Sequence, residues 1–211
     1  MKKIIIGTGN ETKYQLYRNL FSYLNEKDIK VEKLSEDIIT NNEVKESLDD
    51  IAANAILKAK TYAQKSGHLT LADDTAIFIP ALNNEPGIAV RRWGGILPKE
   101  ISDAEWEKFF LNKINKLQIT EPACIKRQVI AISKPNGNYK IIENNLFGKI
   151  KTHGAGVYKP GGPFSAYFFI DQCQRFESEL NENDEDILYA EFKLKVIDSI
   201  LELDPDFFLL K

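Results

Sequence analysis

An apolar run that contains two adjacent acidic residues constrains the fold of this 211-residue chain most strongly. Leu69 to Ala72 has the composition of a buried β-strand, Asp73 and Asp74 follow it, and Ile77 to Ile79 can continue it. A buried carboxylate without a partner is costly, so a metal ion, a lysine or a bound phosphate complex is expected to compensate it. The fold therefore has to bring such a partner to the end of this strand.

Helices alternate with strands along the rest of the chain, which predicts an α/β fold with a mixed sheet. Further strands are expected at Lys2 to Ile6, Val31 to Leu34, Cys124 to Ser133, Tyr139 to Ile142, Leu146 to Lys151 and Ala166 to Ile170. Helices are expected at Thr12 to Leu24, Leu48 to Lys65, from the Ser102 capping box to about Leu117, and Asp184 to Leu203. Because the chain has no repeat or long linker, we expect a single domain over residues 1–211.

The charge and the N-terminal segment exclude several classes of partner. A net charge of −3 and a pI of about 5.6 argue against a nonspecific binder of nucleic acid or of anionic membranes. The apolar run Ile4 to Ile6 is too short for a signal peptide or a membrane span. The two cysteines lack metal-ligand spacing and suit a reduced interior. We therefore expect a cytoplasmic protein without a nucleic-acid or membrane partner.

A glycine-bearing turn between the first strand and the first helix is a candidate phosphate site. Gly7 to Asn10 forms this turn, and Lys13 falls in the first helical turn, where backbone N–H groups and the helix dipole favour an anion. The spacing matches neither the P-loop nor the dinucleotide-binding fingerprint. An ordinary strand-to-helix turn therefore remains an alternative.

The second predicted helix places polar side chains on one face. Asn54 and Lys58 are four residues apart, and Ser47 lies seven residues before Asn54, so all three can face one groove. Ser47 also stands three residues before Asp50, as in a capping box. A solvated helix face is the alternative, and Glu46 just ahead of the helix gains a role only if it meets the aspartate pair.

The two aspartates are expected to have different roles. Adjacent residues of a regular strand point to opposite faces, so Asp73 and Asp74 do not both enter one site, and one of them is structural. Mg²⁺ binds few carboxylates together with waters and phosphates, which suits one aspartate plus a distant glutamate. Two turn-forming carboxylates are the alternative. Likewise Arg91 and Arg92 either engage a phosphate or face water.

Several motifs taken in order closely resemble the inosine triphosphate pyrophosphatase family, whose members hydrolyse noncanonical purine nucleoside triphosphates. The motifs are Thr8-Gly9-Asn10-x-x-Lys13, Glu46-Ser47, Asn54 to Ala59, Ala72-Asp73-Asp74-Thr75, Pro86-Gly87-Ile88 and Arg92-Trp93-x-Gly95. The match covers about the first 95 residues and continues more weakly through Cys124 to Ser133 and Gly148 to Ile150. The resemblance implies an elongated mixed β-sheet flanked by helices, two lobes around a central cleft, Mg²⁺ dependence and commonly a homodimer.

The resemblance also implies residue roles. Asp74 matches the proton acceptor and, with Glu46, the metal ligands of the family. The substrate-binding positions would be Thr8, Gly9, Asn10, Lys13, Asn54, Lys58, Thr75 and Arg92. In this hypothesis Asp74 orients or deprotonates a water that attacks the α-phosphorus, while metal and lysines neutralise the phosphates. Pyrophosphate and a nucleoside monophosphate are the products.

The C-terminal third departs from the family pattern. The family's Gly-Phe-Gly-Tyr-Asp-Pro element corresponds to Gly162 to Tyr167, without the acid, and its Ser-His-Arg element has no counterpart near Asp186 to Glu191. In the family these elements contact and select the purine base, so their loss predicts weaker discrimination between bases or selection of a different base. The substrates that the resemblance implies are ITP, dITP, XTP or an unidentified relative. The alternative is a nucleotide-binding or regulatory protein that kept the scaffold with weak or no turnover.

Overall fold

The computed structural model describes residues 2–35, 37–38, 44, 50–98, 100–158 and 160–209. It divides into two compact units. Unit 1 comprises Met1–Asp74, Gln128–Asn144 and Tyr189–Lys211, and unit 2 comprises Thr75–Arg127 and Asn145–Leu188. No helix of the described ranges is both long enough and apolar enough to cross a membrane.

The strands form an eight-stranded mixed sheet with the order β2-β1-β3-β5-β6-β7-β8, and β4 pairs with β3. Parallel pairs join β1 to β2 and to β3, and antiparallel pairs join β3 to β4, β6 to β7 and β7 to β8. The strands are β1 Lys2–Ile6, β2 Ile29–Lys33, β3 Leu69–Ile79, β4 Glu85–Gly87, β5 Ala123–Ser133, β6 Tyr139–Ile150, β7 Phe168–Ile170 and β8 Arg175–Phe176. The mixed α/β architecture expected from the sequence is thus confirmed.

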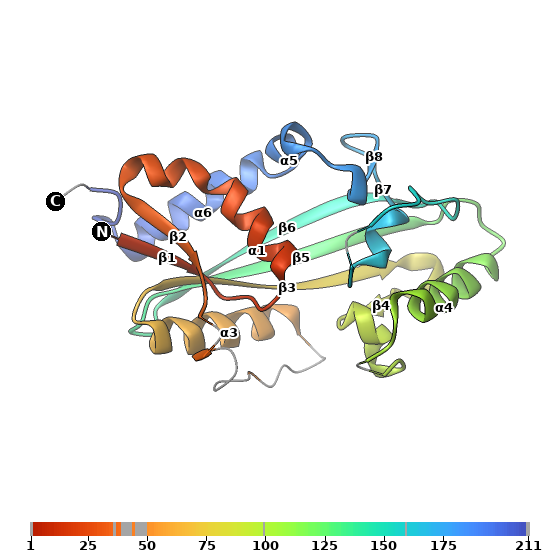
Figure 1. Cartoon of the computed structure of the whole chain (residues 1–211), viewed down its shortest axis with the longest axis horizontal. Coiled ribbons are helices and arrows are strands. Elements are labelled where there is room, and N and C mark those ends of the chain that lie inside the picture. Colours follow the sequence, from red (N-terminus) through yellow and green to blue (C-terminus); the bar gives the residue numbers. More distant parts are fainter. Residues whose placement is uncertain are drawn as a thin grey trace. The chain divides into compact units, whose positions relative to one another are not determined.

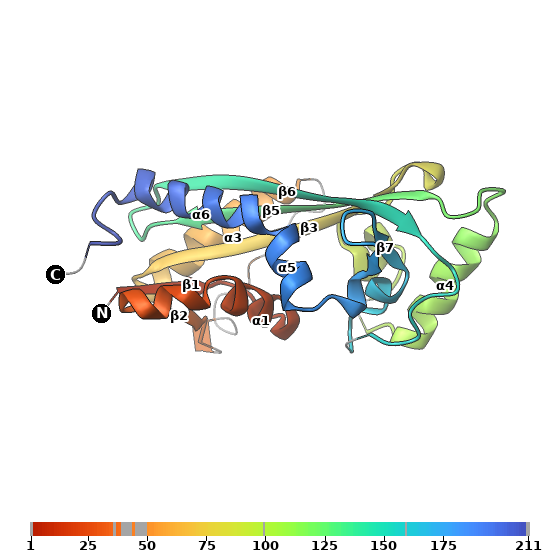
Figure 2. The same cartoon turned by 90° about the horizontal axis from the view of Figure 1, so that it is seen from above.

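In unit 1, helices cover both faces of the strands. α1 (Glu11–Leu20) and α6 (Ala190–Leu203) lie on one face, and α3 (Ile51–Ser66) lies on the other (Figures 1 and 2). Each helix buries an apolar stripe against the strands, as amphipathic helices do. Side chains of α3 in this core include Ala55, Ala59 and Ala63, which are fully buried. The β3 residues that carry the aspartates therefore face a helix on either side.

In unit 2, α4 (Asp103–Asn115) builds an aromatic core. The predicted capping box is present, because the Ser102 hydroxyl accepts from the Glu105 N–H and the Glu105 carboxylate accepts from the Ser102 N–H. Trp106, Phe110 and Ile114 form its buried face, and the short helix η3 (Val90–Gly95) adds the buried Trp93. The short helices η4 (Pro163–Ala166) and η5 (Glu177–Glu179) and helix α5 (Glu182–Leu188) complete this unit.

Several predicted elements differ from those observed. The expected strands at 139–142 and 146–151 are one strand, β6. The polar residues between them suit a strand, because Glu143 and Asn145 are exposed while the Asn144 amide donates to the Gln128 amide oxygen. The predicted final helix is interrupted at Tyr189, whose buried hydroxyl donates to the Gln128 amide oxygen at 3.2 Å. β3 is continuous, so the aspartates lie within a strand and not at its end.

Helix α3 begins three residues later than predicted, and Asp50 is its N-cap. The Asp50 carboxylate accepts from the backbone N–H groups of Ala52 and Ala53 at 2.7 and 3.2 Å, which satisfies two otherwise unpaired donors. The helix ends at Ser66, and its C-cap Gly67 has a φ of 70°, which suits a residue without a Cβ. Ser47, which the sequence suggested as the cap with Asp50 three residues after it, lies outside the described residues.

We expect Asp50→Ala to lower the free energy of unfolding by about 1 kcal/mol, because the two capped N–H groups lose their acceptor. Asp50→Ser retains a capping oxygen and serves as the matched control. Urea denaturation of the three proteins measures the difference. Equal unfolding midpoints for Asp50→Ala and wild type would show that the cap contributes nothing.

Candidate active site

The turn at residues 7–10 connects the end of β1 to the start of α1 and lies close to β3. β1 pairs with β3 only as far as Leu71, and the Gly7 N–H donates to the Leu71 carbonyl at 2.6 Å. A Cβ on Gly7 would stand only 3.0 to 3.2 Å from Tyr62, Thr70 and Leu71, so this position requires glycine or a shift of its neighbours. The close approach brings the first turn of α1 toward the two residues that follow Ala72.

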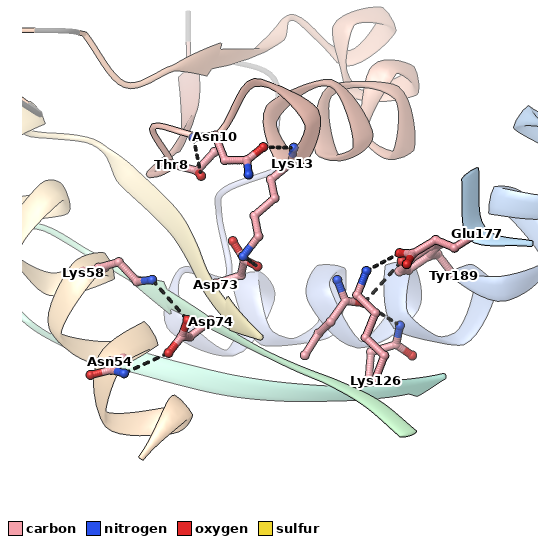
Figure 3. Close-up of polar contacts among 12 residues, drawn as sticks. Thr8, Asn10, Lys13, Asn54, Lys58, Asp73, Asp74, Lys126, Glu177 and Tyr189 are labelled. Atoms are coloured by element: carbon pink, nitrogen blue, oxygen red, sulfur yellow. Dashed lines mark hydrogen bonds and ion pairs between the residues drawn. The ribbon is translucent and has the colours of Figure 1, made fainter. Parts of the chain in front are cut away.

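Side chains of the turn cap α1. The Asn10 side-chain oxygen accepts from the Lys13 N–H at 3.1 Å, and the Thr8 hydroxyl accepts from the Asn10 N–H at 3.1 Å. Asn10 is thus an N-cap, a role that its residue type favours. These contacts fix the start of the helix that carries the Lys13 ammonium (Figure 3). Gly9 lies exposed between the two capping residues.

Asp74 faces α3, where two side chains contact its carboxylate. The Asn54 side-chain amide donates to one carboxylate oxygen at 2.9 Å, and the Lys58 ammonium lies 3.7 Å from the other. Asn54 is 2% exposed, so its amide is fixed by the surrounding core, whereas the Asp74 and Lys58 side chains each retain 14% exposure. The result is an oriented carboxylate with access to solvent (Figure 3).

Asp73 faces α1 on the other side of β3. The Lys13 ammonium donates to its carboxylate at 2.6 Å, and the Asp73 side chain is only 1% exposed. Lys13 therefore contacts Asp73, while Asn54 and Lys58 contact Asp74. The expected division of the two aspartates between opposite faces is confirmed. The lysine that compensates the fully buried carboxylate is one of the partners anticipated from the sequence.

Tyr17 lies close enough to Asp73 to respond to its charge, and the sequence did not indicate this. Its side chain is buried one helical turn after Lys13. Burial raises the pKa of Tyr17 well above its usual value, and the negative charge of Asp73 raises it further. The hydroxyl consequently remains a hydrogen-bond donor. A tyrosine in an amphipathic helix is ordinarily a core residue, so no pattern distinguished it.

Of the remaining predicted site residues, the structure describes Thr75 and Arg92 but not Glu46. Thr75 directly follows Asp74 in β3, and Arg92 lies half-buried in η3 of unit 2. Its neighbour Arg91 is committed to the Asp103 carboxylate and the Ile101 carbonyl and therefore has a structural role. Glu46, the second predicted metal ligand, lies outside the described residues.

The carboxylate of Asp74 has the chemistry of a ligand for a hard cation. Oxygen donors suit Mg²⁺, which retains waters and substrate phosphates and needs only one or two protein carboxylates. Across the described residues there is no cluster of three histidine, cysteine or acidic side chains of the kind that makes a closed metal cage. The single Asp74 carboxylate, with its partial access to solvent, suits an ion that also binds substrate phosphates.

Comparisons with known proteins agree with the predicted resemblance. A dITP/XTP pyrophosphatase from Elusimicrobium minutum is 31% identical over 152 residues, which cover 70% of this chain and 74% of that protein. A dITP/XTP pyrophosphatase from Bacillus cereus is 25% identical over 211 residues, which cover 99% of this chain and 98% of that protein. The solved structure of a HAM1 protein from Coxiella burnetii superposes with a TM-score of 0.74 at 23% identity. The match covers 96% of this chain and 99% of that chain and shows a shared fold.

A family model covers most of the chain and includes nearly all of the residues discussed above. The model of the Ham1 family matches residues 4–187, from within β1 to the last turn of α5. Its span contains the capped turn, Lys13, the α3 face and both aspartates. The chain therefore belongs to the Ham1 family, the inosine triphosphate pyrophosphatase family that its motifs resemble.

Proposed function

We propose that this protein hydrolyses deaminated purine nucleoside triphosphates such as ITP, dITP and XTP to nucleoside monophosphate and pyrophosphate, which removes them from the nucleotide pool. Relatives named dITP/XTP pyrophosphatase support the substrate class. The observation that carries the proposal is the Asp74 carboxylate, held by Asn54 and Lys58 while still accessible to solvent. A binding protein has no need of an oriented carboxylate beside a phosphate.

In this mechanism Asp74 accepts a proton from the water that attacks the α-phosphorus. Asn54 fixes the direction of the carboxylate through its hydrogen bond, and the Lys58 ammonium offsets negative charge beside it. The bond between the α-phosphorus and the bridging oxygen breaks, and pyrophosphate leaves with its electron pair. Lys13 and the capped turn at Thr8, Gly9 and Asn10 bind the phosphates that become the leaving group.

Nucleotide pyrophosphatases of this family depend on a divalent metal ion, and we propose Mg²⁺ for this chain. Asp74 and Glu46 would hold it, and it would neutralise phosphate charge and lower the pKa of a bound water. We also propose that Thr75 and Arg92 bind substrate, that residues 1–211 act as one domain, and that the protein is a cytoplasmic homodimer. The acidic charge balance supports the proposal that nucleic acid is not a partner.

A panel of nucleotides tests the proposal. ITP, dITP, XTP and the four standard ribonucleoside triphosphates are incubated with the protein and Mg²⁺, and pyrophosphate and phosphate are measured separately. We expect pyrophosphate from at least one deaminated nucleotide and its loss when the metal is chelated. Release of phosphate alone would contradict the reaction. Saturable binding without turnover would instead support the nucleotide-binding alternative that the altered C-terminal motifs allow.

A further inference from the structure

The outer edge of β6 is open along most of the strand. β5 lies on one side of β6, and β7 on the other side pairs only with Gly148 to Ile150 (Figure 2). Within the described ranges no strand pairs with residues 139–146 on that side. Lysines often protect such edges from pairing, but the only lysine of this segment, Lys140, is paired with Glu202 of α6. The edge is therefore available to another strand.

A hydrogen bond farther along β6 shows which backbone groups point toward this edge. The Asp171 N–H, directly after β7, donates to the Phe147 carbonyl at 3.0 Å, so the backbone groups of Phe147 face the β7 side. The direction of the backbone groups alternates along a strand with a period of two residues. The N–H and C=O groups of Tyr139, Ile141 and Glu143 therefore face the open edge as well.

The side chains of these three residues lie together on the exposed face of β6. Tyr139 and Ile141 are 41% and 46% exposed, and Glu143 is also exposed, whereas the side chain of Ile142 points the other way and is buried. A positive charge stands on the same face, because the Lys60 ammonium of α3 lies 4.1 Å from the centre of the Tyr139 ring. The open edge thus carries an apolar residue between a cationic end and an acidic end.

We propose that a second copy of this chain pairs with this edge, so that the two β6 strands run antiparallel about a two-fold axis at Ile141. Each copy then presents the same edge to the other, as a two-fold interface requires. Ile141 lies opposite Ile141 of the second copy, and Tyr139 lies opposite Glu143 of the second copy. Because the backbone groups of all three residues face the edge, each residue exchanges hydrogen bonds with the residue opposite it.

Charge complementarity favours a second copy as the occupant and favours this register. Glu143 of the second copy is brought to Tyr139, over whose ring Lys60 lies, and the two-fold axis repeats this contact on the other side of Ile141. An axis at Glu143 would instead place two carboxylates directly opposite each other, which is unfavourable. The inference rests on the homodimer in the proposed function and assigns its interface, and it does not depend on the hydrolytic reaction.

Ile141→Pro tests the strand pairing. Proline lacks the N–H that faces the open edge, and edge strands tolerate proline at such a position. We expect the wild-type protein to sediment with twice the 24.0 kDa mass of one chain. Ile141→Pro should raise the Kd of the dimer about 100-fold, because both copies lose a central hydrogen bond. Sedimentation equilibrium measures both quantities.

Ile141→Val is the matched control for the proline substitution. It keeps the N–H and an apolar side chain at the same position, so the Kd of the dimer should stay within about 3-fold of wild type. Circular dichroism verifies that both variants are folded. A folded Ile141→Pro protein that dimerises with the wild-type Kd would overturn the proposal.

Charge reversal tests the register and does not depend on the proline variant. Lys60→Glu and Glu143→Lys should each raise the Kd about 10-fold, because both contacts of either homodimer then join like charges. In an equal mixture of the two variants, both contacts of the mixed dimer join opposite charges, and its Kd should return to within about 3-fold of wild type. A contact inside one chain cannot produce this rescue. A mixture that dimerises no more tightly than either variant alone would overturn the register.

Sedimentation and turnover separate this inference from the rest of the proposed function. A wild-type protein that stays monomeric would overturn both the interface and the homodimer, while pyrophosphate release from ITP would still support the reaction. A dimer that responds to the variants as expected supports the interface even if no nucleotide is hydrolysed. A dimer that is insensitive to Ile141→Pro and to both charge reversals would retain the homodimer but overturn the β6 interface.

Discussion

Asp74→Asn is expected to lower kcat for pyrophosphate release about 10²- to 10⁴-fold, the loss typical of removing a general base. Asparagine has nearly the same size and can still accept the hydrogen bond from Asn54, but it cannot take a proton from water. The charge beside Lys58 is also lost. The fold should be unaffected, because the Asp74 side chain is partly accessible to solvent. Steady-state rates with ITP and Mg²⁺ measure the effect.

The control for this substitution is Asp171→Asn, which makes the same chemical change at an exposed turn of unit 2. Its kcat should remain within about 2-fold of wild type, since surface substitutions rarely have larger effects. Turnover by Asp74→Asn equal to that of wild type would remove Asp74 from the mechanism. Turnover reduced equally in both variants would indicate a general loss of folded protein.

Phe110→Ala should lower the free energy of unfolding by about 3–5 kcal/mol, because it leaves a cavity in the aromatic core of unit 2. Phe110 is 0% exposed and stacks on Trp106 with ring centroids 5.2 Å apart. The rings of Phe164 and Tyr167 pack on the same ring, with centroids 6.0 and 5.4 Å from that of Phe110. These three aromatic side chains thus lose packing through one substitution. Guanidinium denaturation followed by tryptophan fluorescence reports the change, since Trp106 is part of the cluster.

Phe147→Ala provides the comparison at an exposed site. Phe147 lies on β6 with 58% exposure, so the same truncation creates no cavity and should cost less than about 1 kcal/mol. If both alanine variants unfolded at the same denaturant concentration, the aromatic cluster would not be the stabilising core of this unit. Activity measured well below the unfolding transition should be retained by Phe147→Ala.

The sequence predicted the separation of the aspartates because strand alternation is a local rule. Asp73 and Asp74 are adjacent in a strand, so their side chains had to point to opposite faces, and they contact α1 and α3 respectively. The Asn54 and Lys58 pair followed from helical spacing in the same way. Sequence reasoning included a lysine among the possible compensating partners, but it assigned Lys13 to the phosphate site and did not pair it with Asp73. That pairing depends on the order of strands and on the faces that the helices cover.

Other features depend on tertiary contacts and were missed. Tyr17 has the pattern of an ordinary core residue, and only the packing of α1 on β3 brings it near the charge of Asp73, which raises the pKa of Tyr17. At the break in the final helix, the Tyr189 hydroxyl donates to Gln128, which lies 61 positions away in the sequence. The start of α3 was misplaced because Ser47 and Asp50 are both good N-cap residues. Glu46 stays a prediction from the resemblance, since it lies outside the described residues.

Hydrolysis in water labelled with oxygen-18 tests the central claim most directly. If Asp74 directs water to the α-phosphorus of ITP, one labelled oxygen appears in inosine monophosphate and none in pyrophosphate. Asp74→Asn should then lower the rate of labelling of the monophosphate by the same factor as kcat. Label in pyrophosphate, or a labelled monophosphate formed by Asp74→Asn at the wild-type rate, would contradict the account.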